Sequence, residues 1–564
     1  MAIKSKTAQA SVPQVTRIVF TALLLDILAF TIILPLFPRL LQFYRNSEHG
    51  NQTSLLAWSL SRLTDFQNMV GLNDSQGSTV KRPPRMDIVL LGGALGSLFS
   101  VLQFIASPII GKLSDVLGRR RVLLITMLGN MVSCGVWLFS RSFELFVLSR
   151  VIGGLSEGNV QLSIAMISDI TTPATRSKGL AMVGIAFAIA FTIGPALGAY
   201  FANKDLVSVF PGLAQYGLHP FSGSALLAMV LLTVESLYLY AKLPETNSES
   251  WRLAVHQTIE EEKKKASAER NGRSVSSATA TLSNGSASLS APITMDTKAI
   301  VQLQHKYLAR LSFTHFAHLF LFSGMEFTLT FLTFHLFDFS HMQQGALLGY
   351  IGILSSLIQG GYVRRKANKV GEKRMVLQGM AAAALGLGCI ALVSSGGSVE
   401  PTALEEKLDL SVFRDIVLWL NAQEWSRKTR MWGLYVGATG LAITSATVVN
   451  CLTSLASLVC DMGSDECVPE QATKGDNKAD LQPIGKGLAL GRFRSWGQLG
   501  RAAGPIAACS LYWRAGPLVC YGAASVIVAV ITILASRILP EVRKLPIRTR
   551  VAVVSSSNSL KKTQ

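Results

Sequence analysis

Long apolar runs, each of about 20 residues, recur along the chain and are separated by short polar turns. A run of this length is enough to cross a bilayer as a helix. The pattern therefore predicts an all-α membrane protein with twelve transmembrane helices. The runs lie at roughly 15–38, 87–110, 121–140, 143–168, 179–201, 222–243, 307–335, 343–363, 375–395, 431–460, 486–511 and 517–538.

A polar segment divides these runs into two sets of six. Its charged stretch 260–265 is followed by Ser, Ala and Asn with few aromatic residues, a composition typical of a disordered tether. Weak repeats between the sets predict two pseudo-symmetric six-helix bundles: Gly118-Arg-Arg-Arg resembles Gly371-Glu-Lys-Arg, and Gly194-Pro195 resembles Gly504-Pro505. The predicted division is an N-terminal half (1–243), a cytosolic linker (244–306), a C-terminal half (307–540) and a cytosolic tail (541–564).

Composition supports a membrane protein. Of 564 residues, 49% are hydrophobic and 15% are charged, whereas soluble domains carry about 25% charged residues. The net charge of +19 comes from basic residues clustered in turns between apolar runs, where lipid headgroups and topology explain them. We therefore expect a lipid bilayer as partner and no nucleic acid.

The basic turns also predict orientation. Short loops rich in Lys and Arg stay in the cytosol, so Lys112 and Arg119-Arg120-Arg121 predict a cytosolic turn. With twelve spans, both termini are then cytosolic. The first run lacks a small-residue cleavage site and is expected to be retained as a span. The loop 39–86 lies outside and carries glycosylation sequons at Asn51 and Asn73.

The segment Gly111-Lys-Leu-Ser-Asp115-Val-Leu-Gly118-Arg119-Arg120 resembles the signature loop between helices 2 and 3 of the major facilitator superfamily of secondary transporters. Segments around Asp26, Arg150, Glu326 and Arg501 extend the resemblance to its animal tetracycline-transporter-like members. That family is regarded as transporting organic anions and is related to drug:proton antiporters. The resemblance implies a binding site between the halves, and a contact from Asp115 to the start of helix 11, near Lys486, when the cavity opens outward.

The sequence shows no motif of an enzyme. It has no phosphate-binding loop of the Gly-x-x-x-x-Gly-Lys-Ser/Thr type, no nucleophile elbow and no His-Glu-x-x-His helix. Cys460 and Cys467 lie near acidic residues but no histidine joins them, so we expect neither a metal nor a cofactor. Transport would therefore be driven by a gradient.

Ionisable residues inside the spans are the candidate site. Each charge near the bilayer centre costs about 2.5 to 3.5 kcal/mol on insertion scales, and such residues normally mark ion or substrate pathways. Those in the predicted spans are Asp26, Arg150, Glu157, Glu235, Glu326, Arg494 and Arg501.

Asp26 lies deep in the first span and suits a proton carrier, although a structural carboxylate paired with an arginine is the alternative. Arg150, Glu157 and Gln161 are seven and four residues apart, which predicts a polar stripe on one face of the helix at 143–168. A purely structural stripe is again the alternative. These residues are candidates for proton coupling or substrate binding.

The C-terminal half offers Glu326 and Arg501. Glu326 is a better candidate than His315 and His318, which we expect to be satisfied interfacial histidines. Arg501 would either attract an anionic substrate or clamp a carboxylate such as Asp26 or Glu326, two alternatives that the sequence leaves open.

Gly194-Pro195 resembles part of the antiporter motif, in which glycine permits close packing and proline bends the helix. Ala replaces Gly at other motif positions, so a structural kink alone would explain it, and Gly504-Pro505 is its counterpart in the second half.

The sequence thus predicts a monomeric, proton-coupled transporter of small amphipathic organic solutes, with organic anions as the expected substrates. The alternatives are a scaffold or receptor with a transporter fold, or a proton-driven multidrug efflux antiporter. The expected location is the plasma membrane or an intracellular membrane, and the family resemblance includes the inner nuclear membrane.

Overall fold

The structure is a computed structural model that describes residues 11–33, 36–48, 52–69, 86–202, 212, 218–247, 297–339, 341–394, 426–462 and 485–541. Within these ranges the long regular elements are all helices. They are α1 (Val12–Thr31), α2 (Phe37–Ser47), α3 (Leu55–Met69), α4 (Met86–Leu117), α5 (Arg119–Leu138), α6 (Phe143–Ser156), α7 (Asn159–Ile170), α8 (Pro173–Ala202), α10 (Ser222–Lys242), α12 (Thr297–Phe337), α13 (His341–Ile358), the π-helix η3 (Gln359–Val363), α14 (Arg364–Val370), α15 (Glu372–Ser394), α17 (Arg427–Cys460) and α18 (Lys486–Ile538).

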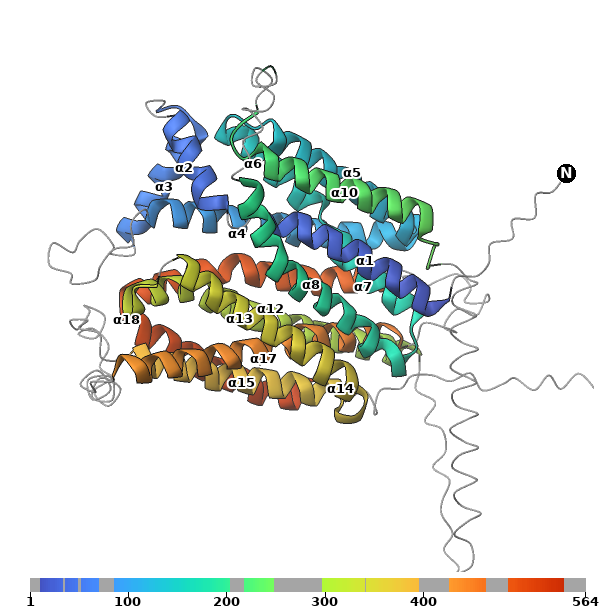
Figure 1. Ribbon diagram of the computed structural model, residues 1–564. Helices are drawn as coiled ribbons and strands as arrows, with labels where there is room; N and C mark the ends of the chain where they lie inside the picture. Colours follow the sequence, from blue (N-terminus) through green and yellow to red (C-terminus); the bar gives the residue numbers. More distant parts are fainter. Residues whose placement is uncertain are drawn as a thin grey trace, which may run out of the picture.

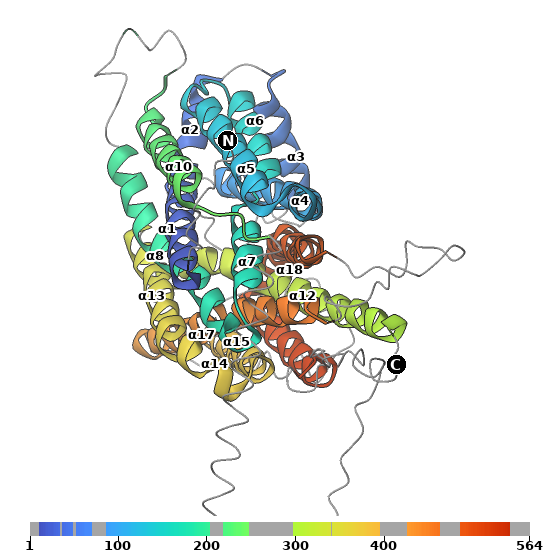
Figure 2. The same cartoon turned by 90° about the vertical axis from the view of Figure 1, so that its right-hand side faces the viewer.

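The helices form two bundles that lie against each other (Figures 1 and 2). One hydrophobic core is built from buried residues between Val15 and Leu243, and the other from residues between Leu308 and Leu539 together with Ala165 of α7. Large apolar side chains such as Leu237 and Val526 remain exposed on the outer faces of the helices. Exposed apolar surface of this kind is suited to contact with lipid.

Ten helices in the described part of the chain are long and apolar enough to span a membrane. One of them, α18, contains two predicted spans, joined at Gly516, whose φ of 79° breaks the helix. Another predicted span, 143–168, is divided into α6 and α7, each shorter than a membrane-crossing helix. Allowing for both, the described helices account for the predicted pattern of twelve crossings.

Three boundaries differ from the sequence prediction. The first helix ends at Thr31, before the predicted limit of 38, and the segment around Pro38 forms the separate helix α2. The predicted outer loop contains α3 as well. Helix α12 begins at Thr297, inside the segment expected to be linker, because its first turns continue the helix beyond the apolar run.

The two ends of the bundle can be recognised from their contacts. At one end, Asp115 of α4 contacts the start of α18, and Gln304 near the start of α12 donates to backbone carbonyls at the end of α17. We call this the Asp115 end. At the other, the side chains of Tyr44 and His219 bond backbone carbonyls of Ser140 and Trp137, and we call it the Trp137 end.

Helices α4 and α18 form the main contact between the halves. Ser97 donates to the carbonyl oxygen of Ala502 at 3.0 Å, and Ser495 donates to that of Phe104 at 2.6 Å. Nearer the Asp115 end, a Cβ atom at Gly491 would lie 2.5 Å from the carbonyl oxygen of Ser107, so the two backbones touch there. This seam positions the candidate site between the halves.

Candidate functional site

Two carboxylates lie where the fourth span is broken. The backbone leaves helical geometry at Glu157, and α7 starts again at Asn159. The Asn159 amide donates to Asp26 Oδ1 at 2.6 Å, and the Asn130 amide donates to Glu157 Oε2 at 3.4 Å. Both acids are buried. They lie at the N-terminal end of α7, where the helix dipole favours negative charge.

An arginine from the opposite half completes this group. Arg494 of α18 interacts electrostatically with both Glu157 and Asp26. Asp26 and Glu157 also act on each other, and like charges in a low-dielectric site repel. One C-terminal guanidinium therefore acts electrostatically on two N-terminal carboxylates across the boundary between the halves.

The stripe of Arg150, Glu157 and Gln161 is not carried by one continuous helix. A continuous helix would put them on one face, but the break at Glu157 and Gly158 separates α6 from α7. Gln161 instead donates to the carbonyl oxygen of Ser107 at 2.8 Å, next to the seam with α18. The break coincides with the short polar stretch Ser156-Glu157-Gly158-Asn159, whose effect on the hydropathy of the longer apolar run is small, and the pattern therefore predicted one span.

Arg150 occupies an aromatic site on the Trp137 side of the break. Its guanidinium carbon lies 5.5 Å from the ring centroid of Trp137 and 5.4 Å from that of Phe146. No carboxylate among the described residues lies within ion-pair distance of it. Cation–π contact in place of an acid is a favourable but weaker compensation, so this cation remains available to an anion.

Glu326 and Arg501 form a second pair of charges, both in the C-terminal half. They interact electrostatically, and both residues are solvent-accessible. The ring of the neighbouring Phe327 packs against Gly93 of α4, and the carbonyl of Ala502 accepts from Ser97, so this pair lies beside the other half. Arg501 therefore acts electrostatically on Glu326, one of the two carboxylates predicted for it, and whether it also attracts an anion stays a prediction.

The two histidines of α12 are packing residues. His315 stacks on Phe493 with ring centroids 4.4 Å apart, and His318 stacks on Phe322 at 5.7 Å. Both are buried. They face aromatic rings within their own half, and His315 Nδ1 has no hydrogen-bond partner among the described residues.

Asp115 closes one end of the site. Its two carboxylate oxygens accept from the backbone N–H groups of Gly487 and Leu488, each at 2.8 Å, and so cap the N-terminus of α18. The start of helix 11 is the partner that the motif predicts. A Cβ at Gly111, the first motif residue, would meet the carbonyl oxygen of Gly487, so glycine is required for this approach.

Ion pairs of Arg119 stabilise this helix cap. It pairs with Asp115 at 2.9 Å and with Asp169 of α7 at 3.0 Å, and it is almost completely buried. The side chains of Asp115 and Asp169 are 20% and 11% exposed, so these two ion pairs are only partly removed from solvent.

The turn between α4 and α5 is held by one acid. Glu245 accepts from the backbone N–H groups of Arg119 and Arg120 at 2.9 and 3.2 Å and so caps α5. Gly118 has a φ of 95°, a conformation that favours glycine. Arg120 donates to the carbonyl oxygen of Tyr240 at 2.6 Å.

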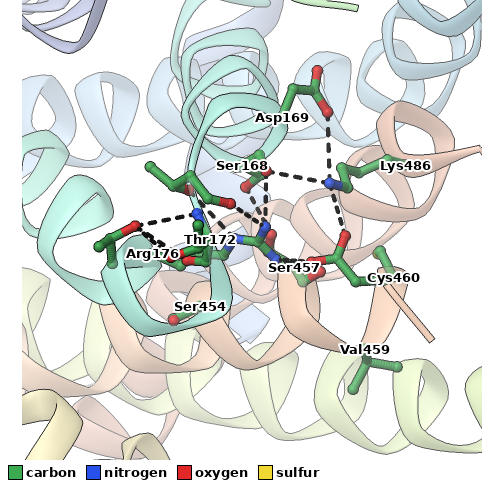
Figure 3. A network of polar contacts seen from close by, with 12 residues as sticks. Ser168, Asp169, Thr172, Arg176, Ser454, Ser457, Val459, Cys460 and Lys486 are labelled. Atoms are coloured by element: carbon green, nitrogen blue, oxygen red, sulfur yellow. Dashed lines mark hydrogen bonds and ion pairs between the residues drawn. The ribbon is translucent and has the colours of Figure 1, made fainter. Parts of the chain in front are cut away.

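A further set of ion pairs joins the halves beside Asp115 (Figure 3). Lys486 at the start of α18 lies 2.8 Å from Asp461 and 3.6 Å from Asp169. Arg176 of α8 pairs with Asp461 and also donates to the Ser168 carbonyl at 2.9 Å. Burial alone would raise the pKa of Asp461, but Arg176 and Lys486 outweigh it and lower that pKa below its usual value. We call Asp115, Arg119, Asp169, Arg176, Asp461 and Lys486 the gate network.

Half of the gate network was not predicted. Asp169, Arg176 and Asp461 lie at helix ends where a charged residue is unremarkable in sequence, and Arg176 and Asp461 are 285 positions apart. Lys486 was expected to support Asp115, yet it binds the neighbouring acids instead.

The glycine–proline pairs have equivalent positions in the two halves. Gly194 allows α8 to approach Thr31 of α1, and Gly504 allows α18 to approach the carbonyl of Phe320 in α12. Pro195 and Pro505 lie inside their helices. Each pair therefore packs the fifth span of its half against the first.

Two predicted sites lie outside the described residues: Asn51 and Asn73. The described residues contain no group of three or more His, Cys, Asp or Glu side chains that could hold a metal ion.

Comparison with known proteins identifies the fold and the family. The family model described as Major Facilitator Superfamily matches residues 19–459. The chain belongs to the major facilitator superfamily. It is a multi-pass membrane transporter and not an enzyme.

Relatives within the superfamily match over different shares of their length. The human major facilitator superfamily domain-containing protein 10 is 34% identical over 517 residues, which cover 90% of this chain and 89% of the relative. The crystal structure of the human organic anion transporter MFSD10 (TETRAN) matches with a TM-score of 0.65 and 30% identity, over 93% of this chain and 100% of that one. Multidrug resistance protein 1 of Bacillus subtilis is 30% identical over 176 residues, 30% of this chain and 42% of the relative.

Proposed function

We propose that this chain is a proton-linked transporter of organic anions that works by alternating access. The observation that carries the proposal is the cross-half group of Asp26, Glu157 and Arg494. Two carboxylates that bind protons belong to one half, and the cation that attracts them belongs to the other.

This arrangement links protonation to movement of the halves. Alternating access requires the halves to rock against each other, which changes the distance from Arg494 to Asp26 and Glu157. The attraction between a carboxylate and Arg494 is stronger in one arrangement of the halves than in the other. Protonation of the carboxylate removes this attraction. A proton therefore shifts the equilibrium between the two arrangements.

The gate network supports the second part of the mechanism. In this structure the Asp115 end is closed by ion pairs and by the capped start of α18, so the state described here is shut on that side. We propose that this end faces the cytosol, because its turns carry Lys112 and Arg119 to Arg121. The cycle then alternates between this state and one in which the gate network is separated.

Two arginines that take no part in the proton site, Arg150 and Arg501, are suited to bind an anionic substrate. Arg150 has aromatic neighbours and no described carboxylate partner, and Arg501 is accessible beside a single carboxylate, Glu326. Aromatic surface next to a guanidinium suits an amphipathic anion. The human relative of known structure, titled an organic anion transporter, supports the same substrate class.

The test is transport by the purified protein in liposomes. Uptake and efflux of labelled amphipathic anions and cations are measured with and without an imposed pH gradient. We expect anion transport that the gradient accelerates. Gradient-driven transport of cations alone would instead favour a multidrug antiporter, and binding without transport would favour a receptor or scaffold.

A further inference from the structure

A third buried carboxylate, Glu235 of α10, lies inside the N-terminal half and has no role in the mechanism above. It is 1% exposed. Its Oε2 atom is buried and has no hydrogen-bond partner among the described protein atoms. A buried ionised carboxylate without a partner is very costly, so this group requires an explanation.

Contacts of Ser236, the next residue in α10, place Glu235 near the cross-half group of Asp26, Glu157 and Arg494. The Ser236 hydroxyl donates to Met131 Sδ of α5 at 3.5 Å, and Met131 follows Asn130, which donates to Glu157. Glu235 itself interacts electrostatically with Asp26 and Glu157. Three carboxylates therefore occupy one buried region between α1, α5, α10 and the α6–α7 break.

The charged groups around Glu235 do not neutralise it. Helix α1 contributes Asp26, and the α6–α7 break contributes Glu157. Helix α5 contributes the amide of Asn130 and the thiol of Cys134 to this region. The charged residues of α8, Arg176 and Lys178, lie in its first turns at the Asp115 end, where Arg176 pairs with Asp461.

Two arginines act on described residues of this region, and neither acts on Glu235: Arg150 acts on Cys134, and Arg494 acts on the other two acids. Arg494 acts on Asp26 and Glu157, and these also receive amide hydrogen bonds from Asn159 and Asn130. Amide donors and a guanidinium stabilise the ionised form of a carboxylate. Glu235 has neither, and its two carboxylate neighbours repel a further negative charge.

We propose that Glu235 is a resident proton-holding residue of this transporter, the innermost member of a three-carboxylate proton site with Asp26 and Glu157. In the state described here it carries the proton. When Asp26 or Glu157 loses its attraction to Arg494, the Glu235 O–H bond breaks, and an O–H bond forms at the neighbouring carboxylate. No electron moves, and the charge passes from one carboxylate to the other. The transport role rests on the proposed function above, whereas the proton on Glu235 can be observed directly.

Infrared spectroscopy of the purified full-length protein tests the protonation. A protonated carboxylic acid shows a C=O stretching band that an ionised carboxylate lacks, and that band shifts on exchange into ²H₂O. We expect the band at neutral pH in the parent protein and in the matched control Glu144→Gln, which alters an exposed acid of α6. In Glu235→Gln the band should lose the intensity of a single carboxyl group.

Two further results keep the proposal falsifiable. If Glu235→Gln does not fold, Glu235→Asp retains the acid on a shorter side chain, and the band should change frequency instead of disappearing. An unchanged band in both variants, or no such band in the parent, overturns the proposal.

Transport measured on the same samples separates the two claims. If the parent protein shows the Glu235 band but no gradient-driven transport, the proton site is supported and the proposed transport function is wrong. If the parent protein shows gradient-driven transport but no such band, the transport function is supported and the proton on Glu235 is wrong.

Discussion

Single side chains hold the Asp115 end closed, and Asp115 itself makes the most direct contact between the halves. Its carboxylate caps α18 and pairs with Arg119. Cys460 at the adjacent α17 terminus is buried and lies near Asp461 and Lys486, so we expect its thiol to become more accessible when this end opens.

We predict that Asp115→Asn opens this end more often. The amide keeps one acceptor oxygen but loses the charge that favours the helix N-terminus and Arg119, a loss of about 1 kcal/mol for a helix cap. Alkylation of Cys460, followed by mass spectrometry, should become about five-fold faster. Asp65→Asn, which breaks an exposed pair on α3, is the control. Equal alkylation of Cys460 in parent and variant would show that Asp115 merely shapes its turn.

A second residue-scale prediction concerns pH at the Trp137 end. Burial lowers the pKa of His219 below its usual value of 6.5, although the Trp137 carbonyl that it bonds acts in the opposite direction. His219 Nδ1 accepts from the Phe221 N–H at 3.2 Å, which requires that nitrogen to be unprotonated. The unfolded state therefore binds a proton more readily than the folded state, so the contribution of His219 to stability is present at high pH and decreases as pH falls below 6.5.

Thermal unfolding in detergent checks this sign. His219→Asn should lower the melting temperature at high pH, and the difference from the parent should narrow as the pH is lowered. Asn keeps an acceptor near the Nδ1 position but cannot be protonated there. A difference that is constant with pH would show that His219 does not titrate in this range.

At the scale of helices, the seam between α4 and α18 sets how closely the halves approach. Gly491 faces the backbone of Ser107, and the neighbouring Gln161 amide lies 2.9 Å from the position of its missing Cβ. Backbone atoms cannot move aside as a flexible side chain would.

We therefore predict that Gly491→Ala separates α4 from α18 at the Asp115 end. Overpacking of this kind costs about 1–3 kcal/mol in the closed state and less in the open state. Cys460 alkylation should accelerate by at least about five-fold. The matched control is Gly522→Ala on the same helix α18, where a Cβ meets nothing within 4 Å. If both variants react at the parent rate, the seam is not a close-packed contact in solution.

The helix pattern was largely predictable, and its exceptions have physical reasons. Apolar runs predict spans well because lipid requires continuous hydrogen-bonded helices. The same runs conceal the break at Glu157, since two irregular residues inside an apolar segment change its hydropathy little. The motif predicted that Asp115 meets the start of α18, but the pairing of Arg176 with Asp461 depends on how the two halves fold together.

At the scale of the whole molecule, the charges divide into two layers. The gate network at the Asp115 end pairs acids with bases, and the pKa of Asp461, lowered by Arg176 and Lys486, keeps that carboxylate ionised as the pH falls to its usual value. Deeper in the molecule lie the three carboxylates Asp26, Glu157 and Glu235, and Arg494 acts on the first two of them. We infer that pH acts on transport through the deeper layer and not through the gate network.

The central claim is that proton binding at Asp26 and Glu157 drives the exchange between states. The most direct measurement is uptake of a labelled organic anion into liposomes containing the parent protein or Asp26→Asn, each with and without a pH gradient. We predict that the gradient accelerates uptake by the parent, whereas Asp26→Asn inserts normally and transports at the same rate in both conditions. Glu157→Gln should lose part of the gradient effect. A full response to the gradient in Asp26→Asn would contradict the account.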